Sequence, residues 1–438
     1  MQWLEMQNVE YGTCTVLCGK SRTIFMVDCG SVNHRLRGEE RDMSRRFSEI
    51  AVRYHAMQQR HFLLTHYHRD HMNGFYQIVK SFPDYFDRIY LPAIPEDREG
   101  LSPLIDFALF AHVFLPMQTT CAQVNTSCLY AFQRLSRQTG IGRLSVLGQG
   151  DSFTFDGITY DVLWPPREKA DFPDLFRSTV SDMNACLANP YLTGRERDFL
   201  AFKDEFCHMY TRCCRDLSPQ HRAAPDVCER DIRRLDELLS LLDDFAKEMR
   251  RSPVAPDILA LLTAPSARTS YSESTNAMSL VFHNRRTKQA SFDDILMTGD
   301  CTPDTLARLS DALYSDYFIV QAPHHGTSSG YSPVLRDLGI SHLLLSGGDY
   351  PAAGKFAMEY LDFDCIRHCT NTAMCPFFAA SSSCCNRVRY CYDRYPNPAL
   401  SLRCEAAGYS RKNAGCGVYI IDPSGVRGCF CDAPVNRS

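Results

Sequence analysis

The 438-residue sequence lacks three features that would assign it to a special class of protein. It has no run of about 18 uncharged apolar residues, so no membrane-spanning helix is predicted. Residues 1–17 lack the basic start, apolar core and small-residue cleavage site of a secretory signal. The formal net charge of −4 is too small to predict a surface devoted to nucleic acid or anionic membrane. We therefore expect a globular, cytoplasmic protein.

Cysteine, in contrast, is abundant: there are 21, of which 10 fall between Cys365 and Cys431. Without an export signal, reduced thiols or a structural metal explain these cysteines better than a disulfide framework does. The spacings around Cys365, His368 and Cys369 lack the repeated C-x-x-C of a zinc ribbon. A structural zinc and reduced cysteines in sheet-completing strands both remain interpretations of this segment.

Short apolar runs and helical patterns alternate at both ends of the chain. Residues 150–166 have the pattern of a hairpin that turns at Asp156-Gly157. Other strands are predicted at residues 23–27, 61–65, 88–94, 278–282, 293–298, 316–321 and 342–346. This alternation predicts an α/β protein with two sheets flanked by helices.

Strand signals stop between residues 167 and 273. Residues 226–250 carry apolar side chains at helical intervals with charged residues between them, and the segments around 174–188 and 196–216 are similar. We therefore predict a first half-domain at 1–166, a helical insertion at 167–273, and a second half-domain at 274–438 that includes the cysteine-rich segment. The insertion is expected to offer a docking surface to a protein partner.

Four predicted strands end in side chains that bind metal ions. Because residues just beyond strand ends converge at a sheet edge, we expect these groups to meet. Imidazole and carboxylate together favour zinc, or manganese as the share of oxygen ligands rises, with one or two ions per chain. The groups are Asp28 after the first strand, His66, His68, Asp70 and His71 after the second, Asp300, and His324 with His325.

These motifs resemble those of a known family. THYHRDH, at residues 65–71, resembles the HxHxDH signature of the metallo-beta-lactamase superfamily, and FMVDCG, LMTGD and the HHG loop resemble its other strand-end motifs in order. Within the superfamily, the hydrolase domain of ComEC-type DNA-uptake competence proteins is the nearest likeness, through VLWPP, STNAMSLVF, ILMTGD and VQAPHHGTSS. The resemblance covers residues 5–165 and 274–365, without the membrane-spanning part of ComEC.

The resemblance implies an αββα four-layer sandwich with a helical insertion, and hydrolysis by a metal-activated water. Asp28 is expected to orient a ligand histidine, while Asn276 matches the Asn-x-x-Ser pattern of ComEC-type domains. In full, the resemblance implies Asp70 and His325 as catalytic residues, His66, His68, Asp70, His71, Asp300 and His324 as metal ligands, and Asp28, Asn276, Thr327 and Ser328 as supporting or substrate-binding residues.

Phosphodiesters, nucleic acid among them, are the favoured substrates. Thr327 and Ser328 precede a predicted helix start at Ser332-Pro333, and helix starts suit anions. Arginines between Arg35 and Arg46, and the basic stretch RRTK at residues 285–288, are expected to guide a polyanion. Two alternatives remain: hydrolysis of lactam, lactone or thioester bonds, and a binding or regulatory protein that retains the fold.

Overall fold

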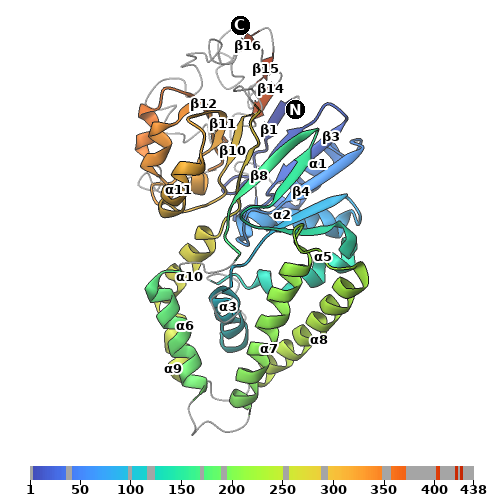
Figure 1. Ribbon diagram of the computed structural model, residues 1–438, viewed down its shortest axis with the longest axis vertical. Helices are drawn as coiled ribbons and strands as arrows, with labels where there is room; N and C mark the ends of the chain where they lie inside the picture. Colours follow the sequence, from blue (N-terminus) through green and yellow to red (C-terminus); the bar gives the residue numbers. More distant parts are fainter. Residues whose placement is uncertain are drawn as a thin grey trace. The chain divides into compact units, whose positions relative to one another are not determined.

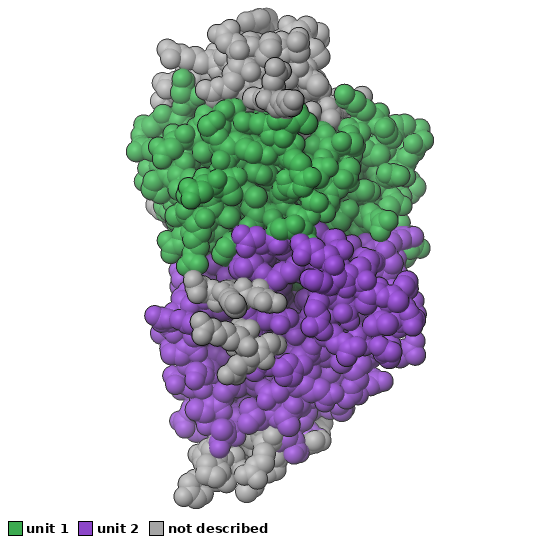
Figure 2. Space-filling model, viewed as in Figure 1, with its two compact units in different colours: residues 1–91, 150–164, 279–438 green, residues 92–149, 165–278 purple. Residues whose placement is uncertain are grey.

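The chain is a mixed α/β protein with two mixed sheets, as the alternation of strand and helix signals predicts. Contacts divide it into unit 1 (residues 1–91, 150–164 and 279–438) and unit 2 (residues 92–149 and 165–278), coloured green and purple in Figure 2. No helix in the part described below is long and apolar enough to cross a membrane. The structure, a computed structural model, describes residues 3–35, 42–96, 101–115, 124–167, 172–188, 195–249, 256–287, 294–347, 357–370, 401–404, 420–422 and 425–427.

The first sheet of unit 1 carries the N-terminal strands. Strands β1, β2 and β3 pair antiparallel, and β3, β4 and β5 pair parallel. Helices α1 (Met43–Arg53) and α2 (Arg69–Ser81) follow β3 and β4. Apart from β6, which is given below, the strands of this sheet are in spatial order β14 (Ser401–Cys404), β1 (Trp3–Met6), β2 (Thr15–Cys18), β3 (Thr23–Val27), β4 (Gln59–Leu63) and β5 (Arg88–Pro92).

The second sheet of unit 1 combines a parallel half, β10 to β13, with an antiparallel half, β7 to β10. The predicted hairpin is confirmed, with Asp156 and Gly157 in the left-handed conformations that its turn requires. The spatial order is β13 (Ile366–Cys369), β12 (Gly339–Leu345), β11 (Asp316–Gln321), β10 (Ile295–Met297), β9 (Val281–Asn284), β8 (Ile158–Trp164) and β7 (Ser152–Phe155).

Shorter elements complete unit 1. Figure 1 shows α11 in orange beside β10, β11 and β12. These elements are α11 (Pro303–Leu309), η3 (Ser310–Ala312), η4 (Pro323–Gly326), η5 (Pro333–Asp337), η7 (Met358–Asp362), and the hairpin of β15 (Ile420–Asp422) and β16 (Gly425–Arg427). Residues 371–400 and 405–419 lie outside the described residues, so both interpretations of the cysteine-rich segment stay predictions.

Aromatic rings fill both faces of the first sheet. On one face, Phe25 of β3 stacks on Phe153 of β7 with ring centroids 5.0 Å apart, which joins the two sheets. On the other face, Phe62 of β4 stacks on Phe75 of α2 at 3.9 Å. The register places Phe62 opposite Met26, one position beyond Phe25, and neighbouring strand residues point to opposite faces. The first sheet is therefore covered by the second sheet on one face and by helix on the other.

Unit 2 is mainly helical. It contains the predicted helical stretch together with residues 92–149, which the sequence division placed in the first half-domain. The physical reason is α3, which is buried along almost all of its length and packs Phe107 against Phe176, and Phe110 against Phe199. The elements are α3 (Pro103–Phe114), η1 (Ser127–Tyr130), α5 (Ala131–Thr139), η2 (Ile141–Arg143), β6 (Leu144–Leu147), α6 (Asp174–Leu187), α7 (Arg195–Asp216), α8 (Pro225–Met249), α9 (Pro256–Thr263) and α10 (Pro265–Ala277).

Candidate metal centre

Side chains that follow β3, β4, β10 and β11 gather around Asp300 in unit 1. Asp300 is only 3% exposed, and its backbone N–H donates to Ser279 Oγ. Its Oδ1 lies 3.2 Å from His71 Nε2. Its Oδ2 lies 3.5 Å from His325 Nε2, 3.8 Å from His324 Nε2 and 3.9 Å from His66 Nε2. Four imidazoles therefore surround one carboxylate, as the strand-end pattern predicts.

All four imidazoles turn the same ring nitrogen, Nε2, toward Asp300. Each also has a side-chain oxygen within hydrogen-bond distance of its other nitrogen, Nδ1. A proton on Nδ1 leaves the lone pair on Nε2, which is the form that binds a metal ion. The Nδ1 contacts are His71 with Asp28 Oδ2 at 2.8 Å, His325 with Ser346 Oγ at 3.0 Å, His66 with Thr65 Oγ1 at 3.1 Å, and His324 with Ser329 Oγ at 3.2 Å.

Asp28 fixes the form of His71. A carboxylate only accepts hydrogen bonds, so the Nδ1 of His71 donates to Asp28 Oδ2. Thr65 also donates to Asp28, from its backbone N–H at 2.7 Å and from Oγ1 at 2.8 Å. Asp28 is fully buried, and it lies where the sequence predicts a residue that orients a ligand histidine.

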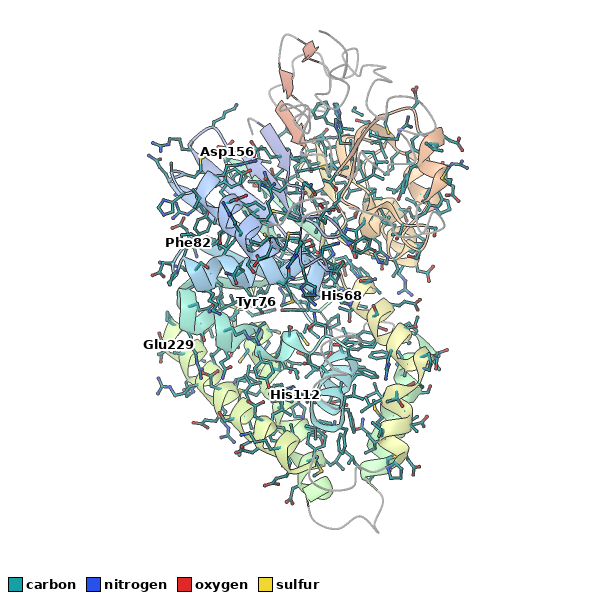
Figure 3. The ribbon with its side chains drawn as sticks, turned by 180° about the vertical axis from the view of Figure 1, so that it is seen from behind. His68, Tyr76, Phe82, His112, Asp156 and Glu229 are labelled. Carbon is teal, nitrogen blue, oxygen red and sulfur yellow. The ribbon has the colours of Figure 1, made fainter. Side chains whose placement is uncertain are left out.

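The start of α2 supplies the remaining predicted ligands. His68 is the N-cap of this helix, and its ring centroid lies 4.7 Å from that of His66 (Figure 3). Asp70 lies in the first turn, with Oδ2 3.2 Å from His325 Nε2. Two sets of potential ligand atoms fit within 4.8 Å: His66, His71 and Asp300, and Asp70, His71 and His325.

The backbone is strained at this centre. Asp28, His324 and His325 have φ values of 56°, 48° and 60°. This left-handed region costs a non-glycine residue about 1 kcal/mol or more. Gly299, before Asp300, also has a positive φ of 53°, and a Cβ there would come within 2.9 Å of Thr65 Cβ. The fold thus maintains an unfavourable backbone at the residues that the sequence marks for chemistry.

Burial and charge set the protonation of these groups. Burial lowers the pKa of His66 well below its usual value and lowers that of His68 to about 4. Burial alone would also lower the pKa of His71, but the carboxylates of Asp300 and Asp28 raise it. Despite its burial, the neighbouring histidines hold the pKa of Asp300 well below the usual range. The centre therefore offers an ionised carboxylate beside the neutral imidazoles of His66 and His68, while the carboxylates around His71 favour its protonated form.

The donor set fits a divalent cation. The Nε2 atoms of His66 and His71 are buried and have no hydrogen-bond partner within the described ranges. Leaving such an atom unsatisfied costs about 1–3 kcal/mol. A cation bound between these nitrogens and Asp300 would satisfy them, and nitrogen with carboxylate oxygen suits zinc or manganese.

The structure differs from the prediction at the segment that was expected to bind an anion. The predicted helix at Ser332-Pro333 is a 3-10 helix of only five residues, η5. Thr327 is buried and donates its hydroxyl to the carbonyl oxygen of His324 at 2.8 Å, while Ser328 is exposed. Asn276 lies near the end of α10 in unit 2, with a buried side chain. The substrate roles of these three residues stay predictions.

The arginines expected to guide a polyanion make contacts within unit 1. Arg285 pairs with Asp161 at 2.6 Å, and Arg286 pairs with Asp294 at 2.8 Å. Arg46 is buried and donates to the carbonyl oxygen of Asn8. Residues 36–41 lie outside the described residues. Arg46, Arg285 and Arg286 therefore form structural contacts, while Arg35 and Arg45 are exposed.

Three residues of the centre were not predicted. Thr65 lies two positions after the end of β4 and Ser346 directly follows β12, so the rule that located the histidines also applies to them. Tyr11 lies in the loop between β1 and β2, with its ring 5.0 Å from that of His325. Nothing in its sequence neighbourhood indicates this placement.

No family model matches the chain, and no curated protein matches it in sequence. The interpretation of the centre therefore depends on its geometry and on the chemistry of its side chains.

Proposed function

We propose that this chain is a metal-dependent hydrolase with a metallo-beta-lactamase-like αββα fold, acting on phosphodiesters. The stacking of Phe75 on Phe62 and of Phe25 on Phe153 supports three of the four layers. Our candidate for the fourth is α11, which Figure 1 draws near β10 to β12. This layering supports the resemblance that the motifs carry.

The observation that carries the proposal is the set of four Nε2 atoms turned toward Asp300. One imidazole nitrogen binds one ion, whereas the two oxygens of a carboxylate can bind two. Asp300 would therefore be the residue that helps to hold both ions if two are bound. His66 and His68 would hold the first ion, and Asp70, His71 and His325 the second. His324, the sequence-predicted ligand whose side chain is 26% exposed, also lies 3.8 Å from Asp300 and would bind from the more exposed side.

Zinc or manganese, when bound, makes a water acidic near neutral pH and neutralises charge that develops on a phosphoryl oxygen. The protein side chains do the rest. Asp70, 14% exposed, orients the attacking water and takes its proton. Asp28 keeps the proton of His71 on Nδ1, and Thr65 holds Asp28 in place. Paired ions that share a bridging carboxylate suit the in-line displacement of a phosphodiester.

A second candidate is hydrolysis of carboxylic esters, lactones or thioesters by the same residues. The ion pairs of Arg285 and Arg286 favour it, because these arginines carry no free charge for a polyanion. The third candidate is a binding protein that retains the centre but catalyses no reaction. Its helical segment would then bind the protein partner that the sequence analysis predicts. Metal content together with substrate choice separates the three.

The test compares wild type with Asp300→Asn and His66→Ala. Each protein is loaded with manganese, freed of excess ion, and assayed on bis(p-nitrophenyl) phosphate, on a dinucleotide and on p-nitrophenyl acetate. We expect both variants to lose bound metal and phosphodiester turnover together. Asp311→Asn, an exposed aspartate outside the centre, is the matched control.

Each alternative has its own result. Turnover confined to the acetate ester would establish the carboxylic substrate. Metal bound in wild type but without turnover on any ester would establish the binding protein. Equal metal content in wild type and Asp300→Asn would disprove the metal centre itself.

A further inference from the structure

The leaving oxygen of an ester needs a proton, and His325 is poorly placed to give one. Its Nδ1 faces Ser346 Oγ at 3.0 Å, and its Nε2 faces Asp70 at 3.2 Å and Asp300 at 3.5 Å. As a ligand through Nε2, this imidazole keeps a proton only on the nitrogen that points away from the centre. The proton donor must therefore be another group.

Tyr11 is a donor at the right place. Its ring lies 5.0 Å from that of His325, and the charges of Asp70 and Asp300 both act on its phenol. Its side chain is half-buried, so it has access both to the centre and to solvent. Burial first, and then the charges of Asp70 and Asp300, raise the pKa of this phenol above its ordinary value, so it carries its proton at neutral pH.

The fold holds the Tyr11 backbone firmly. Its N–H donates to Asn33 Oδ1 at 3.1 Å, and its carbonyl oxygen accepts from the Val32 N–H at 2.9 Å. It also pairs with Gly347, next to the Ser346 that contacts His325. Two positions on, the Thr13 N–H donates to the carbonyl oxygen of Asp70 at 3.1 Å. These contacts join the loop to the centre and hold the backbone that carries the phenol.

We propose that Tyr11 is a catalytic residue that protonates the leaving oxygen, an inference that rests on the proposed function. The water oxygen bonds to phosphorus and loses a proton to Asp70. The bond from phosphorus to the leaving oxygen breaks with its electron pair on that oxygen, which takes the Tyr11 proton. Solvent then returns a proton to Tyr11 and accepts that of Asp70, so one diester and one water give one monoester and one alcohol.

The test uses two diesters that differ in their need for a proton. The leaving oxygen of thymidylyl-thymidine is an alkoxide, which needs protonation, whereas bis(p-nitrophenyl) phosphate releases a stable phenolate. We expect Tyr11→Phe to lower kcat on the dinucleotide about 10²-fold or more and to change kcat on the nitrophenyl ester less than about threefold. Its manganese affinity, measured by calorimetry, should equal that of wild type. Tyr76→Phe, on α2, is the control for losing a hydroxyl from unit 1 (Figure 3).

The outcomes separate this inference from the proposed function. If wild type cleaves both diesters and Tyr11→Phe is equally slow or unimpaired on both, the inference fails while the proposed function stands. Loss of manganese affinity in Tyr11→Phe would also overturn it, because Tyr11 would then be a ligand. If wild type cleaves only the nitrophenyl ester, no substrate would need a proton on its leaving oxygen, and the inference would be contradicted. If wild type cleaves neither, the proposed function fails and the inference fails with it.

Discussion

Each unit buries a cluster of side chains around an aspartate, and the two clusters differ in how far their polar atoms are hydrogen-bonded within the protein. In unit 2, the Asp106 carboxylate accepts from Lys203 Nζ at 2.9 and 3.0 Å, from Cys207 Sγ at 3.0 Å and from Asn184 Nδ2 at 3.2 Å. In unit 1, several Nε2 atoms point at Asp300, and those of His66 and His71 have no hydrogen-bond partner in the described ranges. A cluster whose carboxylate accepts from several protein donors serves folding, whereas one whose inward nitrogens have no hydrogen-bond partner suits a ligand.

We expect the largest effect, a loss of stability, from a substitution that breaks the Asp106 cluster. Lys203→Met removes the only full charge opposite Asp106 that the described contacts give within hydrogen-bond distance, and a buried carboxylate without its partner costs about 3–5 kcal/mol. We expect the urea midpoint to fall when unfolding is followed by far-UV circular dichroism, because most described helices lie in unit 2. Lys247→Met is the control, since its pair with Asp244 is exposed. An unchanged midpoint would mean that this cluster is dispensable.

A double variant sharpens this prediction. Asp106→Leu combined with Lys203→Met replaces the ion pair by apolar groups, which is often nearly neutral for a buried pair. We expect it to recover much of the stability that Lys203→Met loses. A double variant as unstable as the single one would show that the pair itself, rather than the abandoned charge, is what the helices need.

The next effect comes from supplying the ion that the centre in unit 1 is built to hold. Manganese at 100 times its dissociation constant should stabilise wild type by about 2.7 kcal/mol. Manganese is preferred over zinc because the 21 cysteines offer thiolates that favour zinc in the unfolded chain. Both tryptophans, Trp3 and Trp164, lie in unit 1, so their fluorescence reports this unit. No manganese-dependent shift, or an equal shift in Asp300→Asn, would contradict the contrast between the clusters.

The two clusters also differ in how far the sequence predicts them. The centre in unit 1 was predictable because strand ends converge whatever the rest of the fold, so His66, Asp70 and Asp300 followed from short apolar runs. Asp106 and Lys203 lie on different helices and are 97 positions apart in the sequence, so no local pattern predicts that they pair. Tyr11 was missed for the same reason, since its place depends on contacts with Asn33 and Gly347. Local periodicity predicts elements and their ends, while long-range partners need the folded chain.

We expect a smaller effect on metal affinity when a residue that orients a ligand, rather than a ligand itself, is substituted. Asp28→Asn puts an amide nitrogen where a carboxylate oxygen accepts from His71 or Thr65, so the proton of His71 is no longer held on Nδ1. We expect manganese affinity, measured by calorimetry, to fall about 10- to 100-fold. Asp156→Asn is a matched control, because Asp156 also has a left-handed backbone, with φ of 52°, and lies in the β7–β8 turn (Figure 3). Equal affinity in wild type and Asp28→Asn would show that Asp28 only closes a turn.

The smallest expected effect tests whether the outer bonds act through charge or through geometry alone. Ser346 holds His325 Nδ1 at 3.0 Å with a neutral hydroxyl, whereas Asp28 holds His71 at 2.8 Å with a carboxylate. A hydrogen bond between neutral groups contributes about 1 kcal/mol, and one to a charged group about twice that. Ser346→Ala should therefore weaken manganese binding roughly fivefold, less than Asp28→Asn does. Ser315→Ala, which removes an exposed hydroxyl bonded to Asp316, should leave affinity unchanged. If Ser346→Ala weakened binding as much as Asp28→Asn, the position of each imidazole rather than the charge behind it would control the affinity, and Asp28 would have no special role beside the other Nδ1 partners.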